Sequence, residues 1–113
     1  MHLIPLLLVA ALAGCVTPAV AGDAERGRLL LRQYGCGACH RIPGVAAAVG
    51  EIGPPLQGVA RRAYLAGVVP NTPQNMASWI RSPRTHDPRT LMPDMQVSEA
   101  QARDMVAYLY RLR

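Results

Sequence analysis

The sequence predicts a small all-α domain behind an apolar leader. Three separate stretches carry signals for the start of a helix: Asp23, Asn71 or Thr72 before Pro73, and Ser98 with Gln101. Oxygen-bearing side chains at these positions accept bonds from the free N–H groups of a first turn, and proline fits that turn. No stretch gives a convincing strand pattern. A length of 113 residues leaves room for one ordinary domain.

Each predicted helix has its own boundaries. Asp23 predicts a helix that runs to about Tyr34, and Val59–Leu65 is expected to form a short helix. The next helix begins at Pro73 and ends at Pro83, because proline cannot continue a helix. The capping box at Ser98 opens the last helix, in which Ala102, Met105, Val106, Leu109 and Leu112 form an apolar stripe.

Two connections between these helices are predicted to be loops. Residues 41–58 contain four glycines and three prolines, which favour irregular structure. Residues 83–97 contain Pro83, Pro88 and Pro93, and are also expected to form a loop.

The first 22 residues carry no charged side chain, and all 19 Arg, Asp and Glu residues lie at or after Asp23. Leu3 to Ala13 is an apolar run broken only by Pro5. A membrane-spanning helix needs about 20 apolar residues, so this run is too short to be one. It fits the apolar part of a secretory signal instead.

Two processing sites compete in this leader. Ala19-Val20-Ala21 predicts cleavage before Gly22, which makes residues 1–21 a signal peptide and residues 22–113 the mature domain. Leu12-Ala13-Gly14-Cys15 matches a bacterial lipobox, which predicts loss of residues 1–14 and a lipidated Cys15 on a tether of residues 15–22. Both sites predict export to the bacterial periplasm, either soluble or anchored to a membrane by lipid.

Charge and composition exclude some classes of partner. The chain has 12 Arg, no Lys and seven acidic residues, but its arginines are scattered apart from the Arg61-Arg62 pair. With only five aromatic side chains to stack bases, nucleic acid is not an expected partner. An acidic protein or an anionic membrane surface fits better. A mature domain this short and poor in aromatics also suggests that something other than side chains fills its core.

The segment Cys36-Gly37-Ala38-Cys39-His40 is the C-x-x-C-H signature of c-type haem attachment. Each cysteine can form a thioether to one vinyl group of the porphyrin, and His40 is placed to meet the iron. Other interpretations are a structural disulfide, a redox cysteine pair or half of a zinc site. Zinc would need further ligands, of which only His86 remains, and a thioredoxin-like pair would need a βαβ context that the sequence lacks.

From about Gly22 to its end, the chain resembles the class I monohaem cytochromes c, because motifs of that family occur in the family's order. They are a helix from Asp23, C-x-x-C-H, Gly53-Pro54-Pro55-Leu56, a helix with Trp79, Met92-Pro93 and a closing helix. The resemblance implies a small cytochrome c fold of about four to five helices around one covalently bound haem c. It also implies that the first and last helices cross, which would explain Gly27 within the first helix.

The second axial ligand of the iron has five candidates: Met76, Met92, Met95, Met105 and His86. Met105 and Met76 lie on apolar helix stripes, where core packing is the expected role. Met92 precedes Pro93, which disfavours helical geometry and lets an extended segment approach the iron. Met92 also matches the ligand position of the family and is favoured, with Met95 and His86 as alternatives.

The resemblance assigns supporting roles to further residues. The carbonyl of Pro54 is expected to accept the second N–H of His40 and so to orient the ring. Trp79 is expected to donate its indole N–H to a haem propionate, although a plain core tryptophan is the alternative. Tyr64, Arg61 and Arg62 are weaker propionate candidates, since buried carboxylates need donors.

These features predict an electron carrier rather than an enzyme. Iron with both axial positions filled binds no substrate, and methionine ligation raises its reduction potential. Residues 71–83 look like the corresponding segment of cytochrome c domains attached to haem-copper oxidases, so a terminal oxidase is the expected acceptor, with a bc-type complex or a dehydrogenase as donor. Four arginines are candidates to steer an acidic partner: Arg41, Arg81, Arg84 and Arg89. Alternatives are a subunit of a multi-subunit dehydrogenase or oxidase, and an open-site haem peroxidase or sensor.

Overall fold

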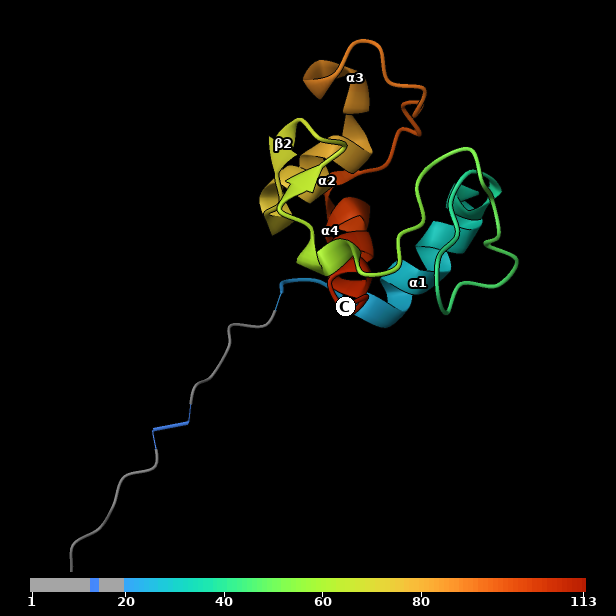
Figure 1. Cartoon of the computed structure of the whole chain (residues 1–113). Coiled ribbons are helices and arrows are strands. Elements are labelled where there is room, and N and C mark those ends of the chain that lie inside the picture. Colours follow the sequence, from blue (N-terminus) through green and yellow to red (C-terminus); the bar gives the residue numbers. More distant parts are fainter. Residues whose placement is uncertain (1–12, 15–19) are drawn as a thin grey trace, which may run out of the picture.

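The computed structural model describes residues 13–14 and 20–113, which are mostly helical (Figure 1). The α-helices in this part of the chain are α1 (Ala24–Gln33), α2 (Pro73–Arg81), α3 (Pro83–His86) and α4 (Glu99–Leu109). Two 3₁₀ turns, η1 (Cys36–Ala38) and η2 (Val59–Arg61), and two short strands, β1 (Tyr64–Leu65) and β2 (Val69–Pro70), complete it. The prediction of a small helical fold is confirmed.

The helices begin where their capping residues predict. The Asp23 carboxylate accepts a bond from the N–H of Arg26 at 3.0 Å, and the Thr72 hydroxyl accepts one from the N–H of Asn75 at 3.1 Å. Thr72 is therefore the N-cap of α2, with Pro73 in its first turn. Ser98 and Gln101 form the full capping box of α4.

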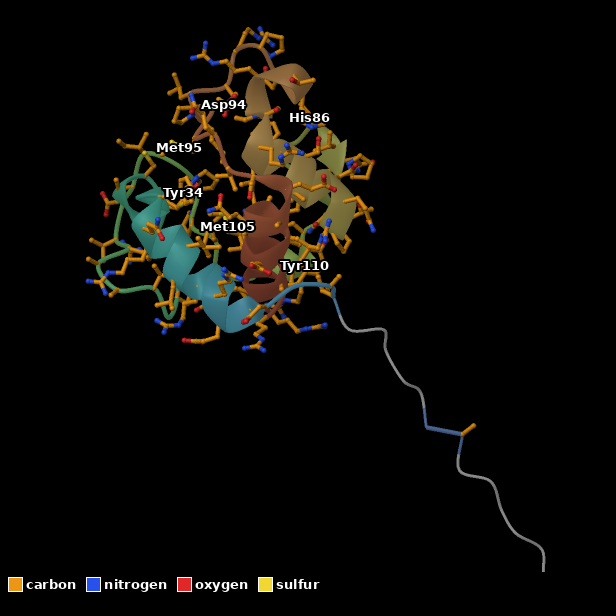
Figure 2. The ribbon with its side chains drawn as sticks, turned by 180° about the vertical axis from the view of Figure 1, so that it is seen from behind. Tyr34, His86, Asp94, Met95, Met105 and Tyr110 are labelled. Carbon is orange, nitrogen blue, oxygen red and sulfur yellow. The ribbon has the colours of Figure 1, made fainter. Side chains whose placement is uncertain are left out.

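The core is centred on the crossing of α1 and α4, which lie side by side in Figure 1. Gly27 allows this crossing, since a Cβ at that position would overlap the backbone of Asp104. Met105 of α4 is fully buried, and Figure 2 shows it within α4 on the side of α1. The first and last helices therefore cross as expected.

The segment Val59–Leu65 departs from its prediction of a short helix. Only the three residues of η2 are helical, and β1 then pairs antiparallel with β2, Leu65 opposite Val69. The side chain of Asn71 explains the early end, because its Nδ2 donates to the carbonyls of Val59 and Arg62 at 2.9 and 2.8 Å. The Arg62 carbonyl is thus bonded by a side chain from outside the segment instead of by the N–H of a following helical turn.

The segment 83–97 also differs in part from the expected loop. Helix α2 ends just before Pro83, as predicted. Pro83 itself occupies the first turn of the four-residue helix α3. From Asp87 to Val97 the backbone is irregular, as expected.

The leader lies mostly outside the described residues, and so does Cys15; the processing predictions therefore stay predictions. Within residues 13–14 and 20–113, no helix has the length and apolar character needed to cross a membrane. Val20 is half-buried and packs against the core, just before α1.

Candidate haem-binding site

The residues of the C-x-x-C-H motif open onto a cavity of about 420 Å³. The end of α1, the motif itself, α2 and the loop before α4 all contribute to its wall. Its lining includes the predicted site residues Cys36, Cys39, His40, Pro54, Trp79 and Met92. The other lining side chains are largely apolar and include Leu31, Leu56, Val59, Leu65, Ile80 and Leu109.

Backbone bonds between two distant segments hold the His40 side of the cavity. The N–H groups of Gly50, Gly53 and Leu56 donate to the carbonyls of Gly37, Cys39 and Arg41, at 3.0, 2.7 and 2.9 Å. Residues 50–56 therefore run alongside residues 37–41 in a fixed register. This register brings the Gly-Pro-Pro-Leu stretch directly to the histidine.

The imidazole of His40 is held on two sides. Its Nδ1 lies 2.7 Å from the carbonyl oxygen of Pro54, which suits an Nδ1–H donor and leaves Nε2 free as a metal ligand. A Cβ at Gly53 would overlap the ring, with Nδ1 at 2.7 Å. Glycine at this position is therefore a requirement of the close approach between loop and ring.

Cys36 and Cys39 are both half-buried; Cys36 begins the η1 turn and Cys39 directly follows it. The N–H of Cys39 and that of His40 both donate to the carbonyl of Cys36, at 3.3 and 3.0 Å. Burial raises the pKa of the Cys36 thiol. The short turn keeps both cysteines on the wall of the cavity.

Met92 reaches the cavity from the irregular segment before α4. Its backbone N–H donates to the Thr90 hydroxyl at 3.2 Å, and its Sδ accepts from Trp79 Nε1 at 3.1 Å. Two of the alternative ligands, Met76 and Met95, also line the cavity. Met76 is only 3% exposed, in the core, whereas Met95 is 37% exposed on the loop that leads to α4 (Figure 2).

The other two alternatives lie away from the cavity lining. Met105 is fully buried in the core, in agreement with its predicted packing role. His86, labelled in Figure 2, has its Nε2 2.8 Å from the Ser78 hydroxyl and its ring beside the indole of Trp79.

The candidate partners of the haem propionates lie in different places. Arg62 lines the cavity, and its guanidinium donates to the carbonyl of Pro55. Arg61 is exposed and Tyr64 is 58% exposed, and neither belongs to the lining. The indole N–H of Trp79 points at the Met92 sulfur, so its predicted bond to a propionate stays a prediction.

Sequence reasoning missed two contributions to the site. Thr90 supports the Met92 backbone, and the only signal was a hydroxyl residue two positions before the methionine. Gly53 had been noted as part of a motif, but its contact with the His40 ring depends on a fold that brings residues 37–41 and 50–56 together.

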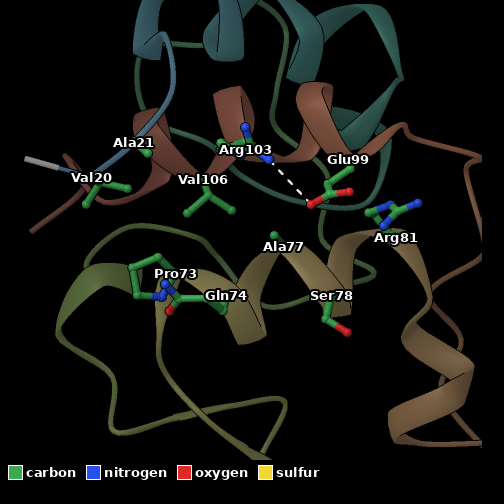
Figure 3. Close-up of a pocket in the computed structure, with 10 residues that line it drawn as sticks. All are labelled: Val20, Ala21, Pro73, Gln74, Ala77, Ser78, Arg81, Glu99, Arg103 and Val106. Carbon is green, nitrogen blue, oxygen red and sulfur yellow. Dashed lines mark hydrogen bonds and ion pairs between the residues drawn. The ribbon is translucent and has the colours of Figure 1, made fainter.

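A second hollow, of about 660 Å³, lies between α2 and α4 (Figure 3). Ala77 of α2 and Val106 of α4 face one another across it, Val20 and Ala21 lie at one end, and the ion pair of Arg103 with Glu99 lies on its α4 side. Arg81 lines this hollow rather than the first cavity. None of its lining residues is a cysteine, histidine or methionine, so it offers no ligand to a haem iron.

The first cavity fits a covalently held haem better than it fits a metal ion alone. Two cysteine sulfurs, one oriented imidazole and the thioethers of three methionines, Met76, Met92 and Met95, meet at a largely apolar hollow. Such a lining suits a flat apolar ring, and its donor set suits iron. Among residues 13–14 and 20–113, no group of three or more His, Cys, Asp or Glu side chains gathers to bind a metal ion, as a zinc site would require.

Comparison with known proteins agrees with this geometry. The family model for cytochrome c matches residues 24–113. Cytochrome c-552 of Bradyrhizobium diazoefficiens is 29% identical over 113 residues, which cover all of this chain and 97% of that protein. Subunit 2 of the cytochrome c oxidase of Alkalihalophilus pseudofirmus is 30% identical over 91 residues, or 80% of this chain. The chain spans only 26% of that subunit.

The family match covers every element that builds the cavity, from α1 to the end of α4. Cys36 and Cys39 stand in the attachment motif, so the cofactor is one haem c bound covalently to these two residues. The protein is a monohaem electron carrier. The chain belongs to the cytochrome c family.

Proposed function

We propose that the protein passes single electrons along an exported respiratory chain, with His40 and Met92 as the axial ligands of its iron. One observation carries this proposal: both side chains line the same cavity, and the His40 ring is already oriented by the Pro54 carbonyl. Bound haem supplies an iron that gains and loses one electron. The chain supplies both axial donors and an apolar enclosure, which together favour electron transfer over binding of a substrate.

Replacement of Met92 tests the ligand assignment. Met92→Ala is expected to abolish the ferric absorption band near 700 nm that marks methionine ligation in the family, to lower the reduction potential and to introduce peroxidase activity. Met105→Leu, a buried methionine in the core away from the cavity lining, is the matched control and keeps the band. A retained band in Met92→Ala would exclude Met92 and move the ligand to another methionine, such as Met95, whereas a band absent already from the unaltered protein would leave His86 as the alternative. Ready binding of CO by the unaltered protein at neutral pH would contradict the carrier role.

A terminal oxidase of the haem-copper class is the proposed acceptor. One of the relatives is named as subunit 2 of a cytochrome c oxidase, and the stretch from Asn71 to Pro83 looks like the corresponding segment of oxidase-linked cytochrome c domains. A bc-type complex or a dehydrogenase is the proposed donor. The match to cytochrome c-552 over nearly all of that protein favours a carrier between such complexes.

The mouth of the cavity has the character of a docking surface. Three of its lining residues are exposed apolar side chains: Ile52 at 75%, Leu91 at 86% and Met95 at 37%. Arg84 and Arg89 are exposed on the same segment as Leu91 and Met95. An apolar patch beside positive charge suits a partner with an acidic surface.

Charge reversal tests this surface. Arg89→Glu is expected to lower the rate of electron transfer to a purified terminal oxidase at low ionic strength, and the loss should shrink as salt is added. Arg32→Glu makes the same change of net charge on an exposed position of α1, and it should leave most of the rate intact. Equal losses for both variants would reject a local docking surface.

Export followed by lipidation at Cys15 is the proposed processing, and contacts made by the residues just before Gly22 support it. Val20 and Ala21 line the hollow between α2 and α4, and cleavage before Gly22 would remove both residues (Figure 3). Mass spectrometry of the mature protein tests this. We expect the mass of one haem plus a diacylglyceryl modification on Cys15, and a Cys15→Ser variant should lose the lipid mass. A mature chain that starts at Gly22 would reject lipidation.

A role as a subunit of a larger oxidoreductase is the second candidate. It is favoured by the match to an oxidase subunit of which this chain spans about a quarter. Co-purification separates the two: a carrier leaves the membrane complexes at moderate salt, whereas a subunit stays with one complex in fixed proportion.

A further inference from the structure

Trp79 is the only tryptophan of the chain, and its single N–H donor is directed at a sulfur atom. The residue lies on α2, is half-buried and lines the cavity. Its Nε1 lies 3.1 Å from the Sδ of Met92. A thioether is a weak acceptor, so a contact this close between two elements thirteen residues apart marks a defined arrangement.

Both partners of this bond are also held by other residues. The His86 ring lies beside the indole, with centroids 6.1 Å apart and planes tilted by 32°, and His86 Nε2 is itself 2.8 Å from the Ser78 hydroxyl. On the other side, the Thr90 hydroxyl accepts from the backbone N–H of Met92. The indole therefore has His86 beside it, and the Met92 sulfur is carried on a backbone that Thr90 anchors.

One indole N–H serves one well-aligned acceptor. The bond to Met92 therefore competes with the bond to a haem propionate that the family resemblance implies for Trp79. Among the residues that line the cavity, Arg62 is the cationic one and remains available to a carboxylate there.

We infer that Trp79 is a positioning residue for the Met92 sulfur, and that it also tunes this sulfur as an iron ligand. The inference rests on the proposed role of Met92. A thioether sulfur has two lone pairs, of which one can bind iron while the other accepts the indole N–H. Donation to the second pair withdraws electron density from sulfur, which favours ferrous iron and raises the reduction potential.

A nuclear magnetic resonance experiment on the reduced holoprotein tests the contact without any substitution at Trp79. Labelling with ¹⁵N-indole tryptophan gives one signal, because the chain has one tryptophan. We expect a nuclear Overhauser effect from this N–H to the Met92 methyl group, which is identified as the methionine methyl signal absent from Met92→Leu. The lack of this effect would overturn the inference.

Isosteric replacement tests the tuning. Incorporation of 3-benzothienylalanine for tryptophan substitutes sulfur for the N–H and keeps the shape of the ring, so packing is preserved. We expect a lower reduction potential and a shifted ferric band near 700 nm. An unchanged band and potential would overturn the tuning role.

A double-mutant cycle separates this inference from the proposed function. Trp79→Phe should lower the potential in the unaltered background, and most of that shift should vanish in a Met92→His background. A shift of equal size in both backgrounds would overturn the inference and favour action through a propionate. If Met92→His alone left the ferric band near 700 nm intact, the ligand assignment itself would fail.

Discussion

Residues 37–56 and residues 87–97 bring the two proposed iron ligands to one cavity, but they are held by bonds of different range. Backbone bonds from Gly50, Gly53 and Leu56 reach back 13 to 15 residues and fix the His40 side. On the Met92 side, most bonds span two or three residues, such as those that Asp87, Thr90 and Asp94 accept. The histidine side is thus built into the fold, while the methionine side is a series of local turns.

We therefore expect the His40 side of the cavity to be stiff and the Met92 side to open more easily. Local turns are broken without disturbing distant segments, so the Met92 side is expected to belong to the less stable part of the molecule. Two longer contacts oppose its opening: the bond from Trp79 to the Met92 sulfur and the bond from Arg81 Nε to the Val97 carbonyl at 3.3 Å.

The largest effect is expected from crowding the stiff side. Gly53→Val places carbon atoms against the His40 ring and should lower the free energy of unfolding by about 3 kcal/mol. Guanidinium unfolding of the ferric protein, followed by circular dichroism, measures it. Ala46→Val adds volume at an exposed position of the 41–58 loop and is the control, with little expected change. A small loss of unfolding free energy for Gly53→Val would show that the loop shifts easily, and the His40 side would then not be the stiff one.

The second largest effect is expected in the unaltered protein, where loss of the band near 700 nm and loss of helical structure should be separate transitions. As guanidinium is added, the ferric band near 700 nm should disappear before the helical circular dichroism signal does. The opening of the Met92 side should cost roughly 2 kcal/mol less than global unfolding. Coincident transitions would mean that both sides of the cavity open as one unit.

Thr90→Ala should produce a smaller and local effect. The variant leaves the Met92 backbone N–H without its hydroxyl acceptor, so loss of the band near 700 nm should become easier by about 1 kcal/mol. Thr85→Ala, an exposed threonine of α3, is the matched control. If the free energy of global unfolding fell by the same amount as the free energy of losing the band near 700 nm, the local character of this bond would be disproved.

The smallest effect is expected at the ion pair that also joins segments 37–41 and 50–56 on the His40 side. Arg41 and Glu51 are 3.5 Å apart, with side chains 58% and 84% exposed. Glu51→Gln should cost less than about 0.5 kcal/mol, and added salt should remove that cost. Thermal unfolding at low and high salt measures it. A loss of several kcal/mol would show that this ion pair, rather than the backbone hydrogen bonds, holds the two segments together.

Local chemistry made part of this molecule predictable. The N-caps Asp23 and Ser98 and the first-turn Pro73 act within a few residues, so the sequence alone located the starts of α1, α4 and α2. The C-x-x-C-H motif is equally local, which is why the attached cofactor could be predicted from five consecutive residues.

Contacts between distant residues made the rest unpredictable. The helix expected at Val59–Leu65 was wrong because the Asn71 side chain binds the carbonyls of Val59 and Arg62. Likewise, the acceptor of Trp79 depends on where the 87–97 segment returns to α2, and no pattern in either segment indicates it. The positions of Met76, Met92 and Met95 on one cavity also required the fold.

The crossing of α1 and α4 has a consequence for how the domain is made. Its ties join residues 81 and 67 positions apart, through the Asp23 N–H to Asp104 and the Tyr34 hydroxyl to Gln101. Such non-local closure slows folding relative to a bundle of neighbouring helices. The core cannot close before residues 99–109 have been synthesised, and until then Cys36 and Cys39 lie in an open chain where attachment chemistry can reach them.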